Sequence, residues 1–123
     1  MARVLIVDDQ EHVRKALRAM FESHEPQWEL SEAEDGRQAV EFTRSIKPDV
    51  VVMDIVMDGM NGVAAACEIR QTAPAAKLVL ISSHYTSSDA SVLSRLLGVG
   101  AFVQKADAGT VLIPTIKRLL RTN

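Results

Sequence analysis

The sequence has few of the features that mark secreted, zinc-stabilised or membrane-spanning proteins. Its 123 residues include a single cysteine, Cys67, so an internal disulfide is excluded. Cysteine and histidine do not cluster at zinc-binding spacing, and no apolar run approaches the roughly 18 residues that a membrane span requires. The start, Met1-Ala2-Arg3, leads into a strand-like run rather than a signal peptide. These absences favour a cytoplasmic protein that folds without disulfides or a structural metal.

Neither sign of charge dominates the chain. It has 14 Lys and Arg against 16 Asp and Glu, a formal net charge of −2. This balance argues against a wholly basic nucleic-acid-binding module, although it leaves a local basic patch open. The length suits one compact domain, and no repeat, low-complexity stretch or linker divides it. We therefore expect a single domain over residues 1–123.

Five short segments have the patterns of β-strands. Residues 4–7, 50–53 and 78–81 are continuous apolar runs rich in β-branched residues, which is typical of strands buried on both faces of a parallel sheet. Residues 28–33 alternate between apolar and polar side chains, and residues 101–104 form a short run. These two segments are expected at the edges of the sheet.

Helical patterns fill the gaps between the strands. Val13, Leu17, Met20 and Phe21 form one stripe of a first helix. The other helices are expected after Asp35 as an N-cap, after Asn61 as an N-cap, over residues 88–97 and over residues 110–120.

Two residues in these helices carry specific expectations. Cys67 lies among alanines and is interpreted as a small buried hydrophobe. Pro114 removes a helical hydrogen bond and clashes with the carbonyl group four residues earlier. We therefore expect the last helix to begin near Thr110 or to kink at Pro114.

Alternating strands and helices predict an α/β fold with a parallel sheet covered on both faces. Two doubly wound strand orders are common, the dinucleotide-binding order and the flavodoxin-like order 2-1-3-4-5. Five strands with the second and fifth at the edges favour the flavodoxin-like, CheY-like order with five helices. In that order the functional crevice lies outside the carboxyl ends of the first and third strands.

Polar side chains follow the strands at this edge of the expected sheet. The first strand ends in Asp8-Asp9 and the third in Asp54, and neighbouring strands are only about 4.8 Å apart. Carboxylates that close repel one another, and Mg²⁺ bound through oxygen atoms would relieve the conflict. Ser82 and Lys105 follow the fourth and fifth strands. An acceptor, a metal site, a hydroxyl and a counter-charge are what a bound phosphoryl group requires.

These motifs resemble the CheY-like receiver domains of two-component response regulators, over essentially the whole chain. The resemblance rests on four segments in order: residues 4–9, residues 54–57 with Gly62, residues 82–83, and residues 100–102 with Lys105. It implies that Asp54 accepts a phosphoryl group from a sensor histidine kinase or a phosphotransfer protein. It also implies a phosphoacceptor rather than an enzyme, with at most weak self-catalysed phosphotransfer and dephosphorylation.

The resemblance assigns the metal site residue by residue. Asp9 and Asp54 would bind Mg²⁺ through their side chains and Val56 through its backbone carbonyl, while Asp8 would hold the waters of the metal. Mg²⁺ is the only cofactor implied.

The resemblance also assigns the phosphoryl-binding and switch residues. The Ser82 hydroxyl, the Ser83 backbone N–H and the Lys105 ammonium would contact phosphoryl oxygens. Phe102 matches the aromatic switch position, expected to turn inward as Ser82 moves towards the phosphate. Phosphorylation would then shift the population towards an active state that partners bind.

The chain departs from the usual family pattern at two positions. Asp58 and Ala106 stand where proline is common, and we expect a trans bond before Ala106 because a cis bond there costs about 2.5–4 kcal/mol. Apolar Val56 cannot orient the hydrolytic water, and His84 lies near its expected approach. A long phosphoryl lifetime, on the order of minutes, is expected from this geometry.

Two other functions fit parts of the pattern. A phosphohydrolase of the haloacid-dehalogenase type also uses a strand-end aspartate, but it carries a second aspartate two residues later, where this chain has Val56. A protein-binding module that is no longer phosphorylated is opposed by the intact acidic residues, Ser82 and Lys105. Asp58 and Ala106 keep this second alternative open.

The expected output is control of a partner or of a following domain. The resemblance favours a receiver from a helix-turn-helix transcription regulator, with the fourth helix, fifth strand and fifth helix as its switching face. A homodimer through helices four and five, or one and five, fits the same family. Lys117, Arg118 and Arg121 are interpreted as a solvated helix end, so we expect no direct nucleic-acid binding by these residues.

Overall fold

The computed structural model describes residues 2–55, 62–82, 95, 98 and 100–121. Several sequence expectations fall on other residues and lie outside this description. They concern the loop at Val56 and Asp58, the cap at Asn61, the Ser83–His84 segment and the helix expected over residues 88–97.

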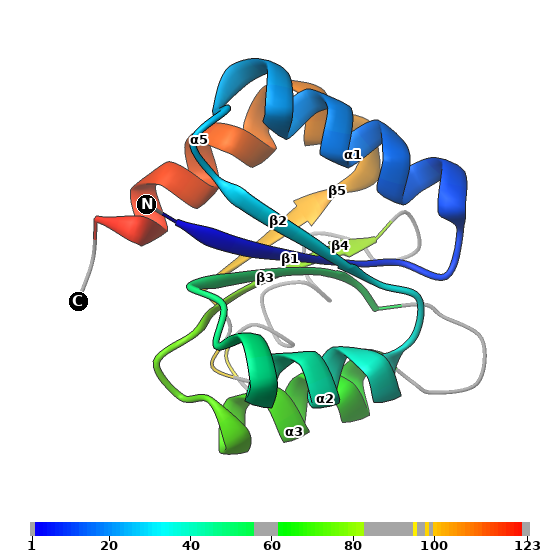
Figure 1. Cartoon of the computed structure of the whole chain (residues 1–123), viewed down its shortest axis with the longest axis vertical. Helices are drawn as coiled ribbons and strands as arrows, with labels where there is room; N and C mark the ends of the chain where they lie inside the picture. The colour runs from blue at the N-terminus through cyan, green and yellow to red at the C-terminus, as the bar shows by residue number, and fades with distance from the viewer. Residues whose placement is uncertain (1, 56–61, 83–94, 96–97, 99, 122–123) are drawn as a thin grey trace.

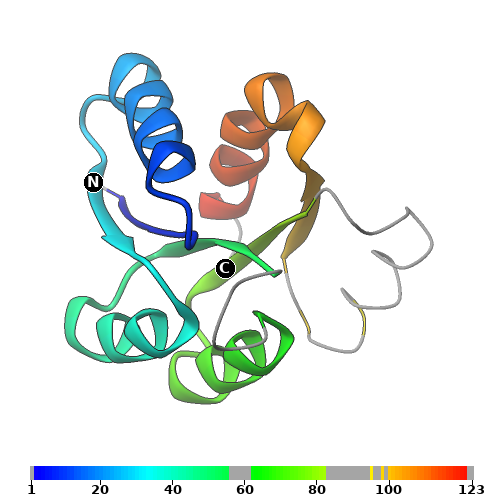
Figure 2. The same cartoon turned by 90° about the vertical axis from the view of Figure 1, so that its right-hand side faces the viewer.

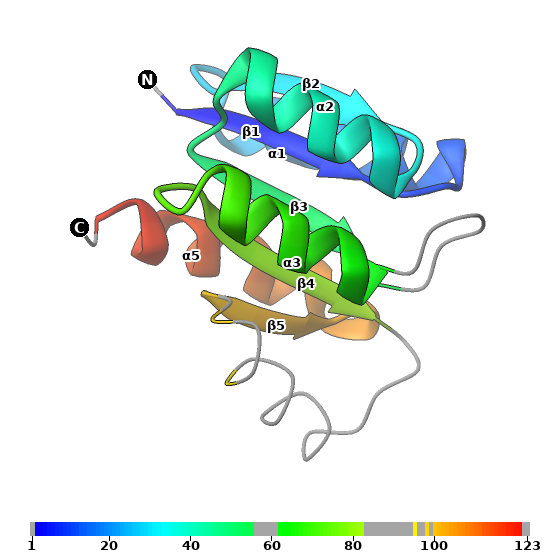
Figure 3. The same ribbon diagram turned by 90° about the horizontal axis from the view of Figure 1, so that it is seen from below.

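A five-stranded parallel sheet forms the centre of the molecule (Figure 3). Its strand order is β2-β1-β3-β4-β5, and each neighbouring pair runs in the same direction. The predicted order is confirmed, including the second and fifth strands at the edges. The strands span β1 Arg3–Val7, β2 Glu29–Ala33, β3 Val50–Asp54, β4 Lys77–Ser82 and β5 Ala101–Gln104.

Helices cover both faces of this sheet (Figures 1 and 2). The pair α1 (Glu11–His24) and α5 (Ala108–Leu120) lies on one face, and α2 (Gly36–Ile46) and α3 (Gly62–Thr72) lie on the other. A short 3₁₀ turn, η1 (Lys105–Asp107), joins β5 directly to α5. Among the described residues, no helix combines the length and the apolar character that crossing a bilayer demands.

The three central strands are buried on both faces, which explains why their sequences are continuous apolar runs. In β1, Leu5 and Val7 pack against α2 and α3, whereas Val4 and Ile6 pack against α1 and α5. All five residues of β3 are buried. The alternation of a strand therefore divides the core into two layers separated by the sheet.

The structure corrects the expectation that Cys67 is buried, since this cysteine is exposed on α3. The buried residues of α3 are Gly62, Ala65, Ala66 and Ile69, which recur every three or four positions. Position 67 falls between these turns and faces away from the sheet. The helical period, rather than the small size of the neighbouring side chains, decides which positions are buried.

The last helix begins at Ala108, two residues before the predicted start, and continues through Pro114. Its apolar stripe is confirmed, because Leu112 and Ile116 are fully buried. Pro114 lies on the exposed side together with Thr110, the residue whose carbonyl the proline leaves without a helical partner. Water can reach that carbonyl, so the helix tolerates the proline. No cis peptide bond occurs among the described residues, as expected for the bond before Ala106.

The predicted cap at Asp35 is confirmed, because its side chain accepts a hydrogen bond of 2.8 Å from the Gln38 N–H. We expect Asp35→Ala to lower the free energy of unfolding by about 1 kcal/mol, since one N–H of the first turn loses its partner. Urea denaturation measures this change. Asp35→Asn is the matched control because its amide oxygen still accepts, and an equal loss in both variants would contradict the capping role.

An ion pair joins the end of α1 to α5. Lys117 Nζ lies 2.9 Å from Glu25 Oε1, and Gln27 Nε2 donates to Glu25 Oε2 over 2.7 Å. The hydrogen bonds from Lys117 and Gln27 lower the pKa of the Glu25 carboxyl below its ordinary value of about 4.5. The sequence suggested that Lys117 belongs to a solvated helix end. The structure instead pairs it with Glu25.

This lowered pKa predicts a pH-dependent contribution to stability. A group that is more acidic in the folded state stabilises it above the unfolded pKa, and the contribution is lost as the pH falls through the folded pKa. We expect Glu25→Gln to be less stable than the wild type at pH 7, with the deficit shrinking below about pH 4.5. Urea denaturation at several pH values measures it, with Glu41→Gln on the exposed side of α2 as control. A deficit that is constant with pH would contradict the role of the pair.

Candidate functional site

Three carboxylates meet at the carboxyl ends of β1 and β3. Asp8 and Asp9 directly follow β1, Asp54 is the last residue of β3, and these two strands are neighbours. One carboxylate oxygen from each of the three residues lies within 4.8 Å of the others. Asp8 and Asp54 are buried, at 2% and 6% exposure, whereas Asp9 is partly exposed. The structure thus brings together the three acidic residues predicted to share a site.

The lysine expected to return towards these acids does so. Lys105 is the first residue of η1, immediately after β5. Its Nζ lies 2.9 Å from Asp54 Oδ2 and 3.7 Å from Asp8 Oδ2. The ammonium therefore crosses the end of β4 to reach the carboxylate at the end of β3.

Burial and charge oppose each other at this site. Burial raises the pKa of Asp8, although the Gln10 N–H and the Lys105 ammonium partly offset it. Burial alone would lower the pKa of Lys105, but its hydrogen bond to Asp54 and the negative charges of the nearby carboxylates together outweigh burial and raise that pKa. Counted by formal charge, three carboxylates against one ammonium leave about two negative charges in a partly buried place. A divalent cation would neutralise them, and the oxygen donors are those that hard cations prefer.

Asp8 also stabilises the connection between β1 and α1. Its Oδ1 accepts a hydrogen bond of 2.9 Å from the backbone N–H of Gln10, the N-cap residue of α1. Its Oδ2 is the atom nearest to Lys105. Asp8 therefore both stabilises the turn that precedes α1 and belongs to the acidic cluster.

Ser82 and Phe102 occupy the next two strands. Ser82 ends β4 and is fully buried, one residue beyond the partner of Asp54 in the register. Phe102 lies in β5 and packs, partly buried, against the core layer beneath α2 and α3. The remaining predicted site residues, Val56 and Ser83, lie outside the described part of the chain.

Sequence reasoning missed two residues beside the acids, Arg14 on α1 and Glu32 on β2. Arg14 Nη1 donates to the backbone carbonyl of Asp8 over 2.7 Å, and Arg14 Nε donates to Glu32 Oε1 over 3.0 Å. A signal was present, because Arg14 flanks the buried stripe of α1. Glu32 shares a face of β2 with Leu30, which packs in the same layer as α1.

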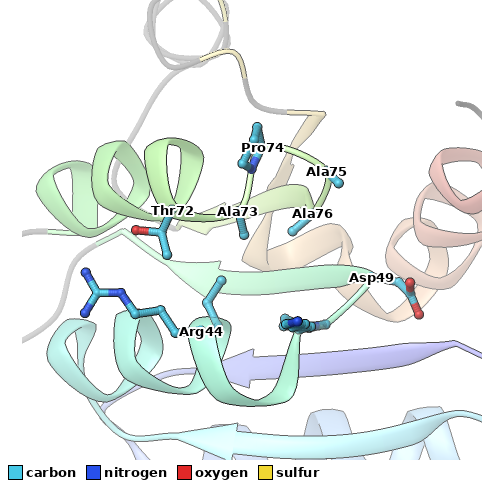
Figure 4. A pocket seen from close by; sticks show the side chains of 10 residues that line it. Arg44, Asp49, Thr72, Ala73, Pro74, Ala75 and Ala76 are labelled. Carbon is cyan, nitrogen blue, oxygen red and sulfur yellow. The ribbon is translucent and has the colours of Figure 1, made fainter.

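Two cavities lie at opposite ends of the sheet. One of about 220 Å³ adjoins the acids between α1 and α5, with Asp54 and Lys105 in its lining. The larger, of about 430 Å³, lies between the end of α2 and the end of α3, where Figure 4 shows Arg44 opposite Thr72 and Pro74. Asp49, which lines the larger cavity, directly precedes β3, whereas Asp54 is the last residue of β3. The larger cavity is therefore at the other end of this strand from the acidic cluster.

Comparison with known proteins places this geometry in a family. The model of the response regulator receiver domain matches residues 4–117. The chain is 35% identical over 114 residues to the transcriptional regulatory protein LiaR of Bacillus subtilis, covering 88% of this chain and 54% of LiaR. It is 33% identical over 112 residues to the response regulator protein VraR of Staphylococcus epidermidis, covering 86% and 54%. The chain spans about half the length of these two relatives.

Solved structures agree in fold. The response regulator domain of Thermotoga maritima CheB superimposes with a TM-score of 0.90 at 28% identity, covering 100% of this chain and 98% of that one. A two-component response regulator of the LuxR family from Aurantimonas sp. SI85-9A1 gives 0.88 at 30% identity, covering 98% and 85%.

One comparison corrects the expectation of a phosphoacceptor rather than an enzyme. The chain is 35% identical over 103 residues to a protein-glutamate methylesterase/protein-glutamine glutaminase of Alkalilimnicola ehrlichii, covering 84% of this chain but 26% of that protein. Proteins with this domain therefore include full-length enzymes, in which the matched portion is the regulatory domain. The strand order, the acidic cluster with its lysine and the match over residues 4–117 agree, and the chain belongs to the family of response regulator receiver domains.

Proposed function

We propose that Asp54 accepts a phosphoryl group from the phosphohistidine of a sensor histidine kinase or a phosphotransfer protein, with Mg²⁺ bound beside it. The observation that carries this proposal is the placement of Asp54, buried between Asp8 and Asp9 on one side and the Lys105 ammonium at 2.9 Å on the other. This arrangement places a nucleophilic carboxylate next to a site for a cation. Both are needed to accept an anionic group.

In the proposed transfer, one carboxylate oxygen of Asp54 forms a bond to phosphorus. The phosphorus–nitrogen bond of the donor breaks, and its electron pair leaves with the imidazole, which then takes up a proton. Bound Mg²⁺ would supply positive charge for the phosphoryl oxygens, held by Asp9, Asp54 and the Val56 carbonyl, with Asp8 holding its waters. Lys105 already contacts Asp54 and would pair with a phosphoryl oxygen. The Ser82 hydroxyl and the Ser83 N–H would contact the others.

The proposed switch uses Ser82 and Phe102. Ser82 follows Ile81, the partner of Asp54 in the β3–β4 pair, and Phe102 is on the neighbouring strand β5. Movement of the Ser82 hydroxyl towards the phosphoryl group would allow Phe102 to turn inward. The face formed by β5, α5 and the helix expected over residues 88–97 would then favour its active conformation.

We propose that residues 1–123 form one receiver domain and that its output is the regulation of transcription. The similarity to LiaR and to a LuxR-family regulator supports this output. Such control would act through a partner or a linked DNA-binding domain, because Lys117 of the small basic patch is already paired with Glu25. Dimerisation through α5, together with α1 or the helix over residues 88–97, is part of the same proposal.

The test is to incubate the chain with acetyl phosphate and Mg²⁺ and to measure its mass. We expect the addition of one phosphoryl group, which a chelator prevents. Borohydride reduction followed by peptide mapping should locate the acyl phosphate at Asp54. A chain that takes up no phosphoryl group from acetyl phosphate or from any phosphohistidine donor would instead be a protein-binding module that is not phosphorylated.

A further inference from the structure

We propose that Arg14 is a positioning residue for the metal site. Held by Glu32, it fixes the peptide group between Asp8 and Asp9 and so holds both carboxylates in place for Mg²⁺. This inference rests on the proposed function, since it assigns a role in binding the metal that phosphoryl transfer requires. It is carried by two hydrogen bonds of one guanidinium, which join the β1–α1 connection to the edge strand β2.

The first of these bonds acts on the backbone of the acidic cluster. Arg14 Nη1 donates to the carbonyl oxygen of Asp8 over 2.7 Å, and the Arg14 side chain is only 12% exposed. The carbonyl of Asp8 and the N–H of Asp9 belong to the same planar peptide group. Fixing that carbonyl therefore orients the Cα atoms of both Asp8 and Asp9.

The second bond anchors the arginine itself. Arg14 Nε donates to Glu32 Oε1 over 3.0 Å, while Arg18 Nε donates to Glu32 Oε2 over 2.6 Å. Burial alone would raise the pKa of Glu32, but the hydrogen bonds from Arg18 and Arg14 outweigh it and lower that pKa, so the carboxylate is ionised. Glu32 is rigidly placed, because it belongs to β2 and pairs with Ile6 of β1.

The two hydrogen bonds of Arg14 are important here because the acidic residues repel one another. The carboxylates of Asp8 and Asp9 lie within 4.8 Å of that of Asp54, and like charges this close favour any movement that separates them. The connection that carries Asp8 and Asp9 also includes a hydrogen bond of 3.2 Å from the Asp8 N–H to the Ala33 carbonyl and one from the Gln10 N–H to Asp8 Oδ1. Groups that orient metal ligands in this way commonly change metal affinity by about 10–100-fold when removed.

The chain supplies a matched control, because Arg14 and Arg18 lie one turn apart and both bind Glu32. Only Arg14 also contacts the Asp8 carbonyl, whereas Arg18 donates to the Leu30 carbonyl at 3.4 Å. Arg14→Met and Arg18→Met therefore each remove one guanidinium from the same carboxylate. A purely structural role predicts similar effects of the two changes on Mg²⁺ binding, whereas the positioning role predicts different effects.

The experiment is a calorimetric titration of Mg²⁺ into the wild type and both variants, with urea denaturation to compare their stabilities. We expect Arg14→Met to weaken Mg²⁺ binding about tenfold or more and Arg18→Met to change it less than about twofold. Arg14→Lys should fall between, since an ammonium can satisfy one of the two acceptors but not both. With acetyl phosphate, the Mg²⁺ concentration for half-maximal labelling should rise by the same factor as the dissociation constant, and the rate at saturating Mg²⁺ should fall much less.

Equal Mg²⁺ affinities of Arg14→Met and Arg18→Met would overturn the inference while leaving phosphoryl transfer to Asp54 intact. A wild-type chain that neither binds Mg²⁺ nor becomes labelled would overturn the proposed function and the inference together. If Arg14→Met does not fold, the pair Arg14→Lys and Arg18→Lys replaces it with the same criterion. In that pair, a loss of Mg²⁺ affinity confined to position 14 supports the positioning role of Arg14, and equal affinities refute it.

Discussion

Asp54→Asn is expected to abolish phosphoryl uptake from acetyl phosphate, reducing labelling by at least about 10³-fold. The amide oxygen of asparagine carries no negative charge and is a poor nucleophile. The substitution therefore removes the carboxylate oxygen that would attack phosphorus. The substitution also deletes the charge that Lys105 Nζ contacts at 2.9 Å and one of the three carboxylates of the acidic cluster. Intact-mass measurement after incubation with acetyl phosphate and Mg²⁺ gives the result directly.

Asp49→Asn is the matched control, because Asp49 directly precedes β3 and Asp54 ends it. Its carboxylate accepts a hydrogen bond of 2.8 Å from the Arg3 N–H at the opposite end of the sheet. That variant should be labelled like the wild type. Labelling that persists in Asp54→Asn would mean that another group accepts the phosphoryl, with Asp8 and Asp9 as the nearest carboxylates.

The second large effect is expected from Gly62→Ala, which should lower the free energy of unfolding by about 3 kcal/mol or more. A Cβ atom at position 62 would lie 2.3 Å from the Cα atom of Ile55 and 2.5 Å from its carbonyl oxygen. These are backbone atoms of the residue that follows Asp54, and they cannot move aside as a side-chain end can. The Gly62 N–H also donates to the Ile55 carbonyl over 3.1 Å, so the backbones of these two residues are in direct contact.

Gly109→Ala is the control for this prediction. Gly109 lies in α5, and a Cβ atom there would meet nothing within 4 Å. The alanine should therefore stabilise the helix, by up to about 1 kcal/mol. Urea denaturation of both variants separates the steric effect at position 62 from the general effect of replacing a helical glycine. A loss at position 62 no larger than the change at position 109 would show that the loop adapts.

The sheet was predictable because its strands are buried on both faces. Val50 to Met53 is a continuous apolar run since α-helices cover each side of β3, and β-branched residues suit such strands. The site followed from topology, because parallel strands place their carboxyl ends at one edge. Asp8, Asp54 and Lys105 are far apart in the sequence, yet this rule predicted their proximity.

Details that depend on side-chain direction could not be predicted in the same way. The Arg14–Glu32 contact requires the register between β1 and β2 and the orientation of α1 above them, and neither is encoded in a local pattern. Cys67 shows the same limit, since one position along a helix turns a side chain by about 100°. Composition suggested a buried thiol there, and helical phase placed it in solvent.

The position of Lys105 links the start of the last helix to the carboxylate of Asp54. β5 ends at Gln104, η1 begins at Lys105, and α5 follows at Ala108 with no intervening loop. Lys105, whose ammonium contacts Asp54, is thus also the first residue of the 3₁₀ turn that joins the sheet to α5. A movement of that ammonium towards or away from Asp54 would act on the turn that precedes α5, a helix of 13 residues. The contact with Asp54 and the start of α5 therefore depend on the same short stretch of backbone.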